Sequence, residues 1–257
     1  MKVVILCGGF GTRIRDTSDN VPKPMISIGR YPILYHIMKT YAHYGFNEFI
    51  LCLGYKAEVI KEYFCNYEMM SNDFTIELGT KNIEIHSNHS ESGWKITLVN
   101  TGLNAMTGAR VKRIEKFVEE DTFMLTYGDG VTDLNIQELL NFHKSHGKTG
   151  TIIGVTPPSR YGELSIHKDQ VTSFMEKPRT QNNSINGGYF VFNRRFFNYV
   201  ENNDSCILER EALEKLASDG ELKVFQHKGF WQCMDTNRDY KYLNKMWGKG
   251  DVPWKVW

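Results

Sequence analysis

The most constraining feature of the sequence is an apolar strand that runs directly into a glycine-rich turn. Val3-Val4-Ile5-Leu6 is apolar at every position, which is typical of a strand buried on both faces of a parallel sheet. The turn Gly8-Gly9-Phe10-Gly11 follows, and its glycines let the backbone approach a bulky anion and point N–H groups at it. Arg13 and Lys23 supply donors suited to phosphate oxygens. The pattern predicts either a polyphosphate site or an ordinary strand-to-helix turn beside two surface cations.

This turn differs from the two commonest nucleotide-binding motifs. A P-loop needs G-x-x-x-x-G-K-[ST], and the chain contains no such string. The dinucleotide fingerprint begins at Gly9 but has Ile14 where its third glycine belongs. The next expected strand ends in Gly54-Tyr55-Lys56, without the carboxylate that would hold a ribose. These departures argue against a nicotinamide enzyme.

Apolar strands alternate with amphipathic helices along the first two-thirds of the chain. This alternation predicts an α/β fold with a mostly parallel, Rossmann-like sheet flanked by helices. The expected strands cover residues 49–53, 94–99, 122–126 and 149–155. The expected helices cover residues 33–44, 57–67, 106–118 and 135–146, and the first of them begins after Pro32.

The rest of the chain predicts smaller elements around this sheet. Segments 164–167 and 171–176 alternate in polarity and predict a small antiparallel hairpin across the sheet. Residues 194–257 are expected to form a C-terminal elaboration, with helices near 194–202, 208–218 and 236–247. Segment 68–93 is polar and irregular, and we expect a lid or a partner-contacting arm there. The whole chain, 1–257, is predicted to be a single catalytic domain.

Composition narrows the classes of partner. A chain of 257 residues that is 41% hydrophobic can bury a sizeable core, and a net charge of +1 predicts no nucleic-acid or membrane partner. No apolar run has membrane-spanning length, and the first strand begins at once, so we expect no signal peptide. Five cysteines without a C-x-x-C pair favour reduced thiols in a cytoplasmic protein. His86 and His89 lie in a polar loop, where we expect no zinc site.

Asp129 is the first candidate for catalysis. It follows the expected strand 122–126 and lies between Gly128 and Gly130. Ligands of open α/β sheets bind outside the carboxyl ends of the strands. An aspartate there is suited to hold Mg²⁺, which prefers one or two protein carboxylates beside phosphate and water. A simple Gly-Asp-Gly turn is the alternative.

Asp235 is the candidate second metal ligand. It ends the segment Phe230-Trp231-Gln232-Cys233-Met234, directly before the expected closing helix. Aspartate is also a favoured N-cap residue, and the spacing alone favours the cap over the ligand.

Three further segments carry polar groups suited to substrate. Lys177 follows the strand 171–175 and is suited to a second phosphate. Met106-Thr107-Gly108-Ala109-Arg110 opens a helix whose free N–H groups, with Arg110, are suited to an anion or the polar edge of a base. Asn186-Gly187-Gly188 offers an amide and open backbone for sugar hydroxyls. For each segment the alternative is a solvated cation or a turn.

The sequence contains no motif of an activated nucleophile. It has no G-x-S-x-G elbow and no cysteine with an evident histidine partner. Two acids with several cations suit nucleotidyl transfer, in which a substrate phosphate oxygen attacks and needs no general base. Catalysis then reduces to alignment and charge neutralisation.

Taken together, these motifs resemble those of the sugar-1-phosphate nucleotidylyltransferases. The segments that carry the resemblance are 6–13, 22–25, 127–130, 174–178 and 186–190, in the expected order. Segments 106–110, 229–236 and 253–257 are similar to the cytidylyltransferase branch of that family in particular. The resemblance spans essentially the whole chain.

The resemblance implies a Mg²⁺-dependent reaction in which CTP and α-D-glucose 1-phosphate give CDP-glucose and pyrophosphate. It implies nucleotide contacts from Leu6, Gly8, Gly9, Phe10, Gly11, Thr12, Arg13, Lys23, Thr107, Arg110 and Gly128. It implies sugar-phosphate contacts from Glu176, Lys177, Asn186 and Gly188, and metal ligation by Asp129 and Asp235. The catalytic set it implies is Arg13, Lys23, Asp129, Lys177 and Asp235. It further implies a homo-oligomer, which would give segment 68–93 a partner.

Three segments depart from the family pattern. Cys7 replaces the usual alanine, Gly29-Arg30-Tyr31-Pro32 stands where Gly-Gly-Lys-Pro is common, and 204–210 (Asp-Ser-Cys-Ile-Leu-Glu-Arg) is unlike the expected sequence. Two alternatives remain open: the same chemistry with another base or sugar, as in a thymidylyltransferase, and a non-catalytic nucleotide-sugar binding protein. The lack of an evident D-x-D motif argues against a glycosyltransferase.

Overall fold

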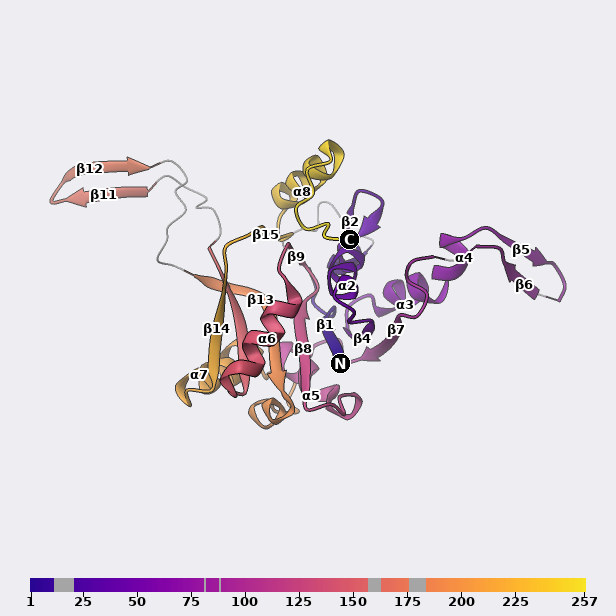
Figure 1. Ribbon diagram of the computed structural model, residues 1–257, viewed down its shortest axis with the longest axis horizontal. Helices are drawn as coiled ribbons and strands as arrows, with labels where there is room; N and C mark the ends of the chain where they lie inside the picture. The colour runs from indigo at the N-terminus through magenta and orange to yellow at the C-terminus, as the bar shows by residue number, and fades with distance from the viewer. Residues whose placement is uncertain (12–20, 81, 88, 157–162, 176–183) are drawn as a thin grey trace.

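The computed structural model describes residues 1–11, 21–80, 82–87, 89–156, 163–175 and 184–257. Its central sheet has seven strands in the order β14-β10-β13-β8-β1-β4-β7 (Figure 1). These strands are β1 (Lys2–Leu6), β4 (Glu48–Leu53), β7 (Lys95–Asn100), β8 (Thr122–Tyr127), β10 (Gly150–Val155), β13 (Ile185–Asn193) and β14 (Leu222–His227). Neighbours are parallel except in the two pairs that contain β13. The predicted mostly parallel α/β sheet is confirmed.

The antiparallel strand β13 lies inside the sheet, which the sequence did not predict. Tyr189 of β13 pairs with Thr126 of β8, and the two strands run in opposite directions. The first residues of β13, including Asn186, therefore lie at the edge where β8 ends. An antiparallel strand thus brings its N-terminal motif to the edge where the parallel strands carry their C-terminal motifs.

The predicted antiparallel hairpin exists, but it does not cross the sheet. β11 (Glu163–His167) and β12 (Gln170–Met175) pair with each other as a separate two-stranded sheet. They carry no hydrogen-bonded pairing to the seven-stranded sheet in the described part of the chain. The expected position of the hairpin is therefore wrong.

Helices cover both faces of the central sheet and enclose two cores. The α-helices of the described residues are α2 (Ile33–His43), α3 (Ala57–Cys65), α4 (Tyr67–Ser71), α5 (Thr107–Arg113), α6 (Ile136–His146), α7 (Leu213–Ser218) and α8 (Asn237–Lys249). Val3 and Ile5 of β1 pack in the core shared with α2 and α6, whereas Val4 packs in the core shared with α5 and α7. β1 is therefore buried on both faces, as its unbroken apolar run predicts.

Several predicted helices are only partly α-helical. The expected helix 106–118 is α5 followed by a 3₁₀ turn, Glu115–Phe117. The expected helix near 194–202 is a 3₁₀ segment, Arg194–Tyr199, and the one at 208–218 begins as a π-helix, Leu208–Ala212, before α7. α6 follows the prediction closely, because Asn135 caps its first turn by accepting from the Glu138 N–H (3.1 Å) and Gly147 ends it at φ 65°.

Segment 68–93, called the arm below, projects from the body of the protein (Figure 1). It carries a hairpin of β5 (Phe74–Glu77) and β6 (Asn82–Ile85), and every residue of these two strands is exposed. Among the described residues, no helix is both long enough and apolar enough to cross a membrane. All five cysteines are free thiols, as predicted.

Candidate active site

The ends of β1 and β8 form the centre of the site. The two strands are parallel neighbours in which Leu6 pairs with Tyr127, so the residues that follow each strand lie side by side. The N–H of Gly128 donates to the carbonyl of Leu6 (3.1 Å). A Cβ on Gly128 would lie 2.7 Å from that carbonyl oxygen, so glycine is required there for close packing of the two chains.

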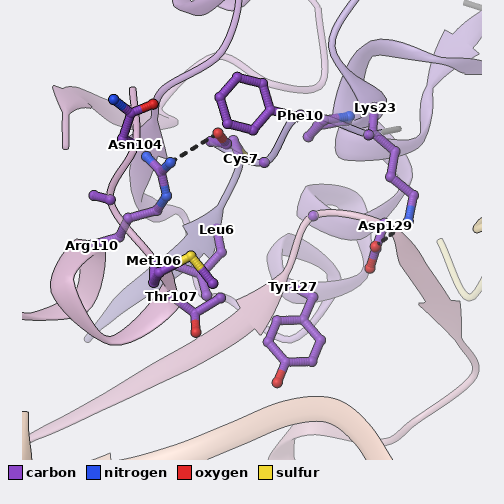
Figure 2. A pocket seen from close by; sticks show the side chains of 16 residues that line it. Leu6, Cys7, Phe10, Lys23, Asn104, Met106, Thr107, Arg110, Tyr127 and Asp129 are labelled. Carbon is purple, nitrogen blue, oxygen red and sulfur yellow. Dashed lines mark hydrogen bonds and ion pairs between the residues drawn. The ribbon is translucent and has the colours of Figure 1, made fainter. Parts of the chain in front are cut away.

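A pocket of about 430 Å³ opens between these two strand ends and the start of α5 (Figure 2). Its size is in the range of small-molecule sites. Ten of its lining residues were predicted to contact nucleotide or metal: Leu6, Gly8, Gly9, Phe10, Gly11, Lys23, Thr107, Arg110, Gly128 and Asp129. The other six are Cys7, Pro24, Asn104, Ala105, Met106 and Tyr127.

Arg110 fastens the wall of this pocket. Its side chain is buried, and its guanidinium donates to the carbonyls of Gly8 (3.0 Å), Leu53 (3.1 Å) and Gly102 (2.7 Å). It also donates to the hydroxyl of Thr101 (2.9 Å) and the carbonyl of Leu103 (3.3 Å). The guanidinium is therefore not a solvated surface cation.

The close approach of Arg110 explains why position 8 is glycine, a residue that the sequence analysis predicted to lie against phosphate. A Cβ on Gly8 would lie 2.1 Å from Nη1 of Arg110, and one on Gly54 would lie 2.5 Å from the same atom. Both positions exclude a side chain because the guanidinium passes between them. Gly11 is different, because its φ of 61° is itself a conformation that favours glycine.

Two of the first N–H groups of α5 already have partners within the protein. The N–H groups of Gly108 (3.0 Å) and Ala109 (3.2 Å) both donate to the carbonyl of Cys206. The expectation of free N–H groups is therefore wrong for Gly108 and Ala109. A segment almost one hundred residues later in the chain satisfies them.

Lys23 joins the two predicted metal ligands. Its ammonium group donates to Oδ2 of Asp129 (2.5 Å) and to Oδ1 of Asp235. Burial lowers the pKa of Lys23, but the charge of Asp129 and the hydrogen bonds that Lys23 donates to both carboxylates outweigh it, and the pKa lies above its usual value. The lysine is held charged between two carboxylates that come from positions 129 and 235.

Two short strands bring Asp235 to Asp129. β9 (Gly130–Thr132) pairs antiparallel with β15 (Trp231–Cys233), and Gly130 lies opposite Cys233. The N–H of Met234 donates to the carbonyl of Asp129 (2.8 Å), which fixes the two chains where the aspartates emerge.

Asp235 does not cap α8, because Thr236 does. The Thr236 hydroxyl accepts from the N–H of Asp239 (3.3 Å), and the Asp239 carboxylate accepts from the N–H of Thr236 (3.0 Å). This reciprocal capping box is the N-cap of the helix. The N-cap role that spacing favoured for Asp235 is wrong, and its carboxylate instead contacts Lys23.

The carboxylates of Asp129 and Asp235 have the chemistry of a magnesium site. Because one ammonium group contacts both of them, they can share one cation. Mg²⁺ is bound through one or two protein carboxylates and takes its remaining ligands from phosphate and water. The described residues contain no cluster of three or more His, Cys, Asp or Glu side chains that would suit a fully protein-ligated metal.

The remaining predicted residues fall into two groups. Asn186 and Gly188 lie at the start of β13, where Asn186 Nδ2 donates to the Tyr127 hydroxyl (3.1 Å) and its Oδ1 accepts from the Gly188 N–H (2.7 Å). They lie beside Tyr127, outside the lining of the pocket. The others, which are Thr12, Arg13, Glu176 and Lys177, lie outside the described residues.

Two thiols lie near the aspartates and are not poised as nucleophiles. Burial raises the pKa of Cys7 well above its usual value, and Cys52 and Asp129 raise it further. Burial and the charge of Asp235 raise the pKa of Cys233 to about 12. A thiol rather than a thiolate stands at both positions near neutral pH, which agrees with the absence of a nucleophile motif.

Comparison with known proteins identifies the class. The model of the nucleotidyl transferase family matches residues 2–245, and the chain belongs to that family. The chain is 48% identical to the glucose-1-phosphate cytidylyltransferase of Salmonella typhimurium, over the full length of both. The family predicted from the motifs is confirmed.

Solved structures agree on the fold. HddC from Yersinia pseudotuberculosis superposes with a TM-score of 0.69 at 26% identity, covering 96% of this chain and 99% of that one. A second structure of HddC, in complex with GMP-PN, matches equally well.

Proposed function

We propose that the protein transfers the cytidylyl group of CTP to α-D-glucose 1-phosphate, giving CDP-glucose and pyrophosphate. The observation that carries the proposal is the pairing of a pocket behind a glycine turn with two carboxylates held by one lysine at its rim. The full-length identity to a glucose-1-phosphate cytidylyltransferase supports the choice of substrates. An HddC structure in complex with GMP-PN supports nucleotide binding by this fold.

In the proposed reaction a phosphate oxygen of the sugar 1-phosphate attacks the α-phosphorus of CTP, and pyrophosphate leaves. The attacking oxygen is already ionised at neutral pH, so this chain needs no general base. The glycine turn, held by Arg110, positions the nucleotide against β1 and β8. Lys23 and Arg13 are proposed to bind the triphosphate, and Thr12 to contact the nucleotide.

The sugar 1-phosphate occupies the side of the site where β13 begins. Lys177 binds its phosphate, and Glu176, Asn186 and Gly188 contact the hexose. The hydrogen bond between Asn186 and Tyr127 supports this placement, because it ties the start of β13 to the end of β8, two residues before Asp129.

Asp129 and Asp235 would hold the magnesium ion. When bound, Mg²⁺ neutralises the charge that the triphosphate carries into the site. Lys23 contacts both carboxylates and lies in the pocket lining, so its ammonium group can turn from the aspartates to a phosphate oxygen.

The arm is proposed to contact a second copy of the chain in a homo-oligomer. Its hairpin and flanking residues expose apolar side chains, and exposed apolar patches often mark protein–protein contacts. These exposed residues are Met70, Phe74, Ile76, Leu78, Ile83 and Ile85. We further propose that the protein acts in the cytoplasm, where free thiols such as its five cysteines persist.

The proposed reaction is tested by its products. ³¹P NMR of the protein with Mg²⁺, CTP and glucose 1-phosphate should show pyrophosphate and a nucleoside diphosphate sugar appearing together. Leaving out either substrate should abolish both signals. Pyrophosphate without the sugar nucleotide, or neither product, would contradict the proposal.

A further inference from the structure

The segment that departs from the family pattern, residues 204–210, contacts the wall of the pocket. It carries the carbonyl of Cys206, which accepts from the first amides of α5, and the carboxylate of Glu209 in the π-helix Leu208–Ala212. Oε1 of Glu209 accepts from the hydroxyl of Tyr127 (2.5 Å), and Oε2 accepts from the hydroxyl of Thr107 (2.7 Å). Both hydroxyl-bearing residues line the pocket, whereas Glu209 does not.

These contacts fix the direction of two hydroxyl protons. A carboxylate only accepts hydrogen bonds, so Thr107 and Tyr127 must both donate to Glu209. Each oxygen also accepts one bond from the protein: Thr107 from the N–H of Leu208 (2.9 Å), and Tyr127 from Asn186 Nδ2 (3.1 Å). Each hydroxyl therefore retains one lone pair and no proton for any further partner. Figure 2 shows the two oxygens turned to the same side, away from Lys23 and Asp129.

We propose that Glu209 is a positioning residue that holds Thr107 and Tyr127 as hydrogen-bond acceptors in the wall of the substrate pocket. Such a wall favours substrate groups that donate, namely hydroxyl and amino groups, over carbonyl oxygens in the same place. Glu209 spans the start of α5 and the end of β8, and through Tyr127 it reaches Asn186 on β13. One carboxylate therefore ties together three elements that surround the site. The inference rests on the proposed reaction, because its readout is the kinetics of that reaction.

The test compares Glu209→Gln with the wild-type protein. The amide keeps the shape of the side chain, but its NH₂ group faces one of the two hydroxyls and forces that hydroxyl to turn its proton. We expect kcat/KM to fall roughly tenfold, the scale of a hydrogen bond to a charged group. We expect the loss mainly in KM for the substrate whose donors face the two hydroxyls, with a smaller change in kcat. Glu214→Gln, an exposed carboxylate on α7, is the matched control and should leave both constants unchanged.

A double-mutant cycle separates positioning from a merely structural role. If Glu209 acts through Tyr127, adding Glu209→Gln to Tyr127→Phe should cost clearly less than it costs alone. Thermal unfolding of each variant shows whether the fold is intact. The inference would be overturned if Glu209→Gln kept the wild-type kinetic constants, or if the losses in the cycle were strictly additive. It would also be overturned if the variant melted at a lower temperature while the kinetic constants of the folded enzyme were unchanged. A wild-type protein that turns over no substrate would instead remove the proposed reaction.

Discussion

Two lysine–carboxylate contacts in this molecule have similar chemistry but different roles. At the site, Lys23 contacts Asp129 and Asp235, whose side chains remain 28% exposed. At the base of the arm, Lys39 contacts Glu91 (2.8 Å), whose side chain is only 6% exposed. Both lysines are similarly buried, so the difference lies in the carboxylates.

The surroundings of the carboxylates separate the two roles. One oxygen of Glu91 accepts from Lys39, from the hydroxyl of Tyr35 (2.8 Å) and from the hydroxyl of Ser90 (2.6 Å). The other oxygen lies 3.3 Å from Nδ1 of His89. The carboxylates at the site are less enclosed, and the lysine that joins them lines a pocket. The same pair of charged groups therefore anchors the arm in one region and supports chemistry in the other.

The largest effect is expected for the site carboxylates. Asp129→Asn and Asp235→Asn should each lower kcat at least 100-fold, because a neutral amide binds a divalent cation poorly and the charge stabilisation it supplies is worth several kcal/mol. The free energy of unfolding should change by less than about 1 kcal/mol, since Lys23 keeps one carboxylate partner. Steady-state kinetics and urea unfolding measure the two quantities. Asp251→Asn, at an exposed position, is the control, and near-wild-type activity in Asp129→Asn would remove that residue from the site.

The next effect is expected at Arg110, which belongs to the site but acts on its framework. Arg110→Lys replaces a planar fork with a single ammonium group, and three donors cannot satisfy the five oxygens that surround it. A hydrogen bond to a charged group contributes about 1.5–3 kcal/mol, and Arg110→Lys loses several of them, so we expect the free energy of unfolding to fall by about 3 kcal/mol.

Arg110→Lys should also loosen the glycine turn that the guanidinium holds, so KM for CTP should rise more than kcat falls. Arg195→Lys, at a largely exposed arginine, is the control and should change stability by less than about 0.5 kcal/mol. An unchanged unfolding free energy in Arg110→Lys would show that the guanidinium does not hold the turn.

The arm carboxylate should show its role through pH. Burial opposes ionisation of Glu91, but hydrogen bonds from Lys39, Ser90 and Tyr35 prevail and lower its pKa to about 2. A carboxyl group whose pKa is lower in the folded state stabilises the fold above its unfolded pKa and loses that contribution as pH falls. Between about pH 5 and pH 2 this group should contribute up to about 3 kcal/mol less to stability.

Urea unfolding at pH 5 and pH 3 measures this loss. Glu91→Gln should be less stable at pH 7 and should show a flatter dependence on pH than the wild-type protein. Glu84→Gln, on the exposed face of the hairpin, should keep the wild-type dependence. The same pH dependence in Glu91→Gln as in the wild type would assign the acid sensitivity to other groups.

The smallest effect on catalysis is expected at the tip of the arm. Ile76→Ser and Ile83→Ser alter exposed side chains at paired positions of the hairpin. Neither residue lines the pocket of the active site. We expect kcat/KM to change less than about twofold. Sedimentation velocity should show weaker self-association if the arm meets a second copy. A large loss of activity without a change in assembly would favour the role of a lid instead.

Comparison of these regions also shows what the sequence predicts well. The strand 3–6 was predicted from its unbroken apolar run, and the helix that begins after Pro32 was predicted from its helical hydrophobic period. Asp129 was predicted because it directly follows an apolar strand. These features depend on neighbouring residues, so local pattern determines them.

The remaining features depend on contacts between distant residues. Asp235 reaches Lys23 only because β15 pairs with β9, and Arg110 is buried only because three separate backbone segments direct carbonyls at it. The role of Glu209 depends on contacts to Thr107 and Tyr127, 102 and 82 residues away. No local pattern reveals such contacts. The one available signal was the departure of residues 204–210 from the family pattern.

The central claim is that this edge of the sheet joins CTP, in preference to other nucleotides, to a sugar 1-phosphate. Its most direct test is the ratio of kcat/KM values for CTP, dTTP, UTP and GTP, measured as pyrophosphate release with glucose 1-phosphate and Mg²⁺. We predict that CTP exceeds each of the others by at least tenfold. A higher value for dTTP, or turnover with no preference, would contradict the assignment.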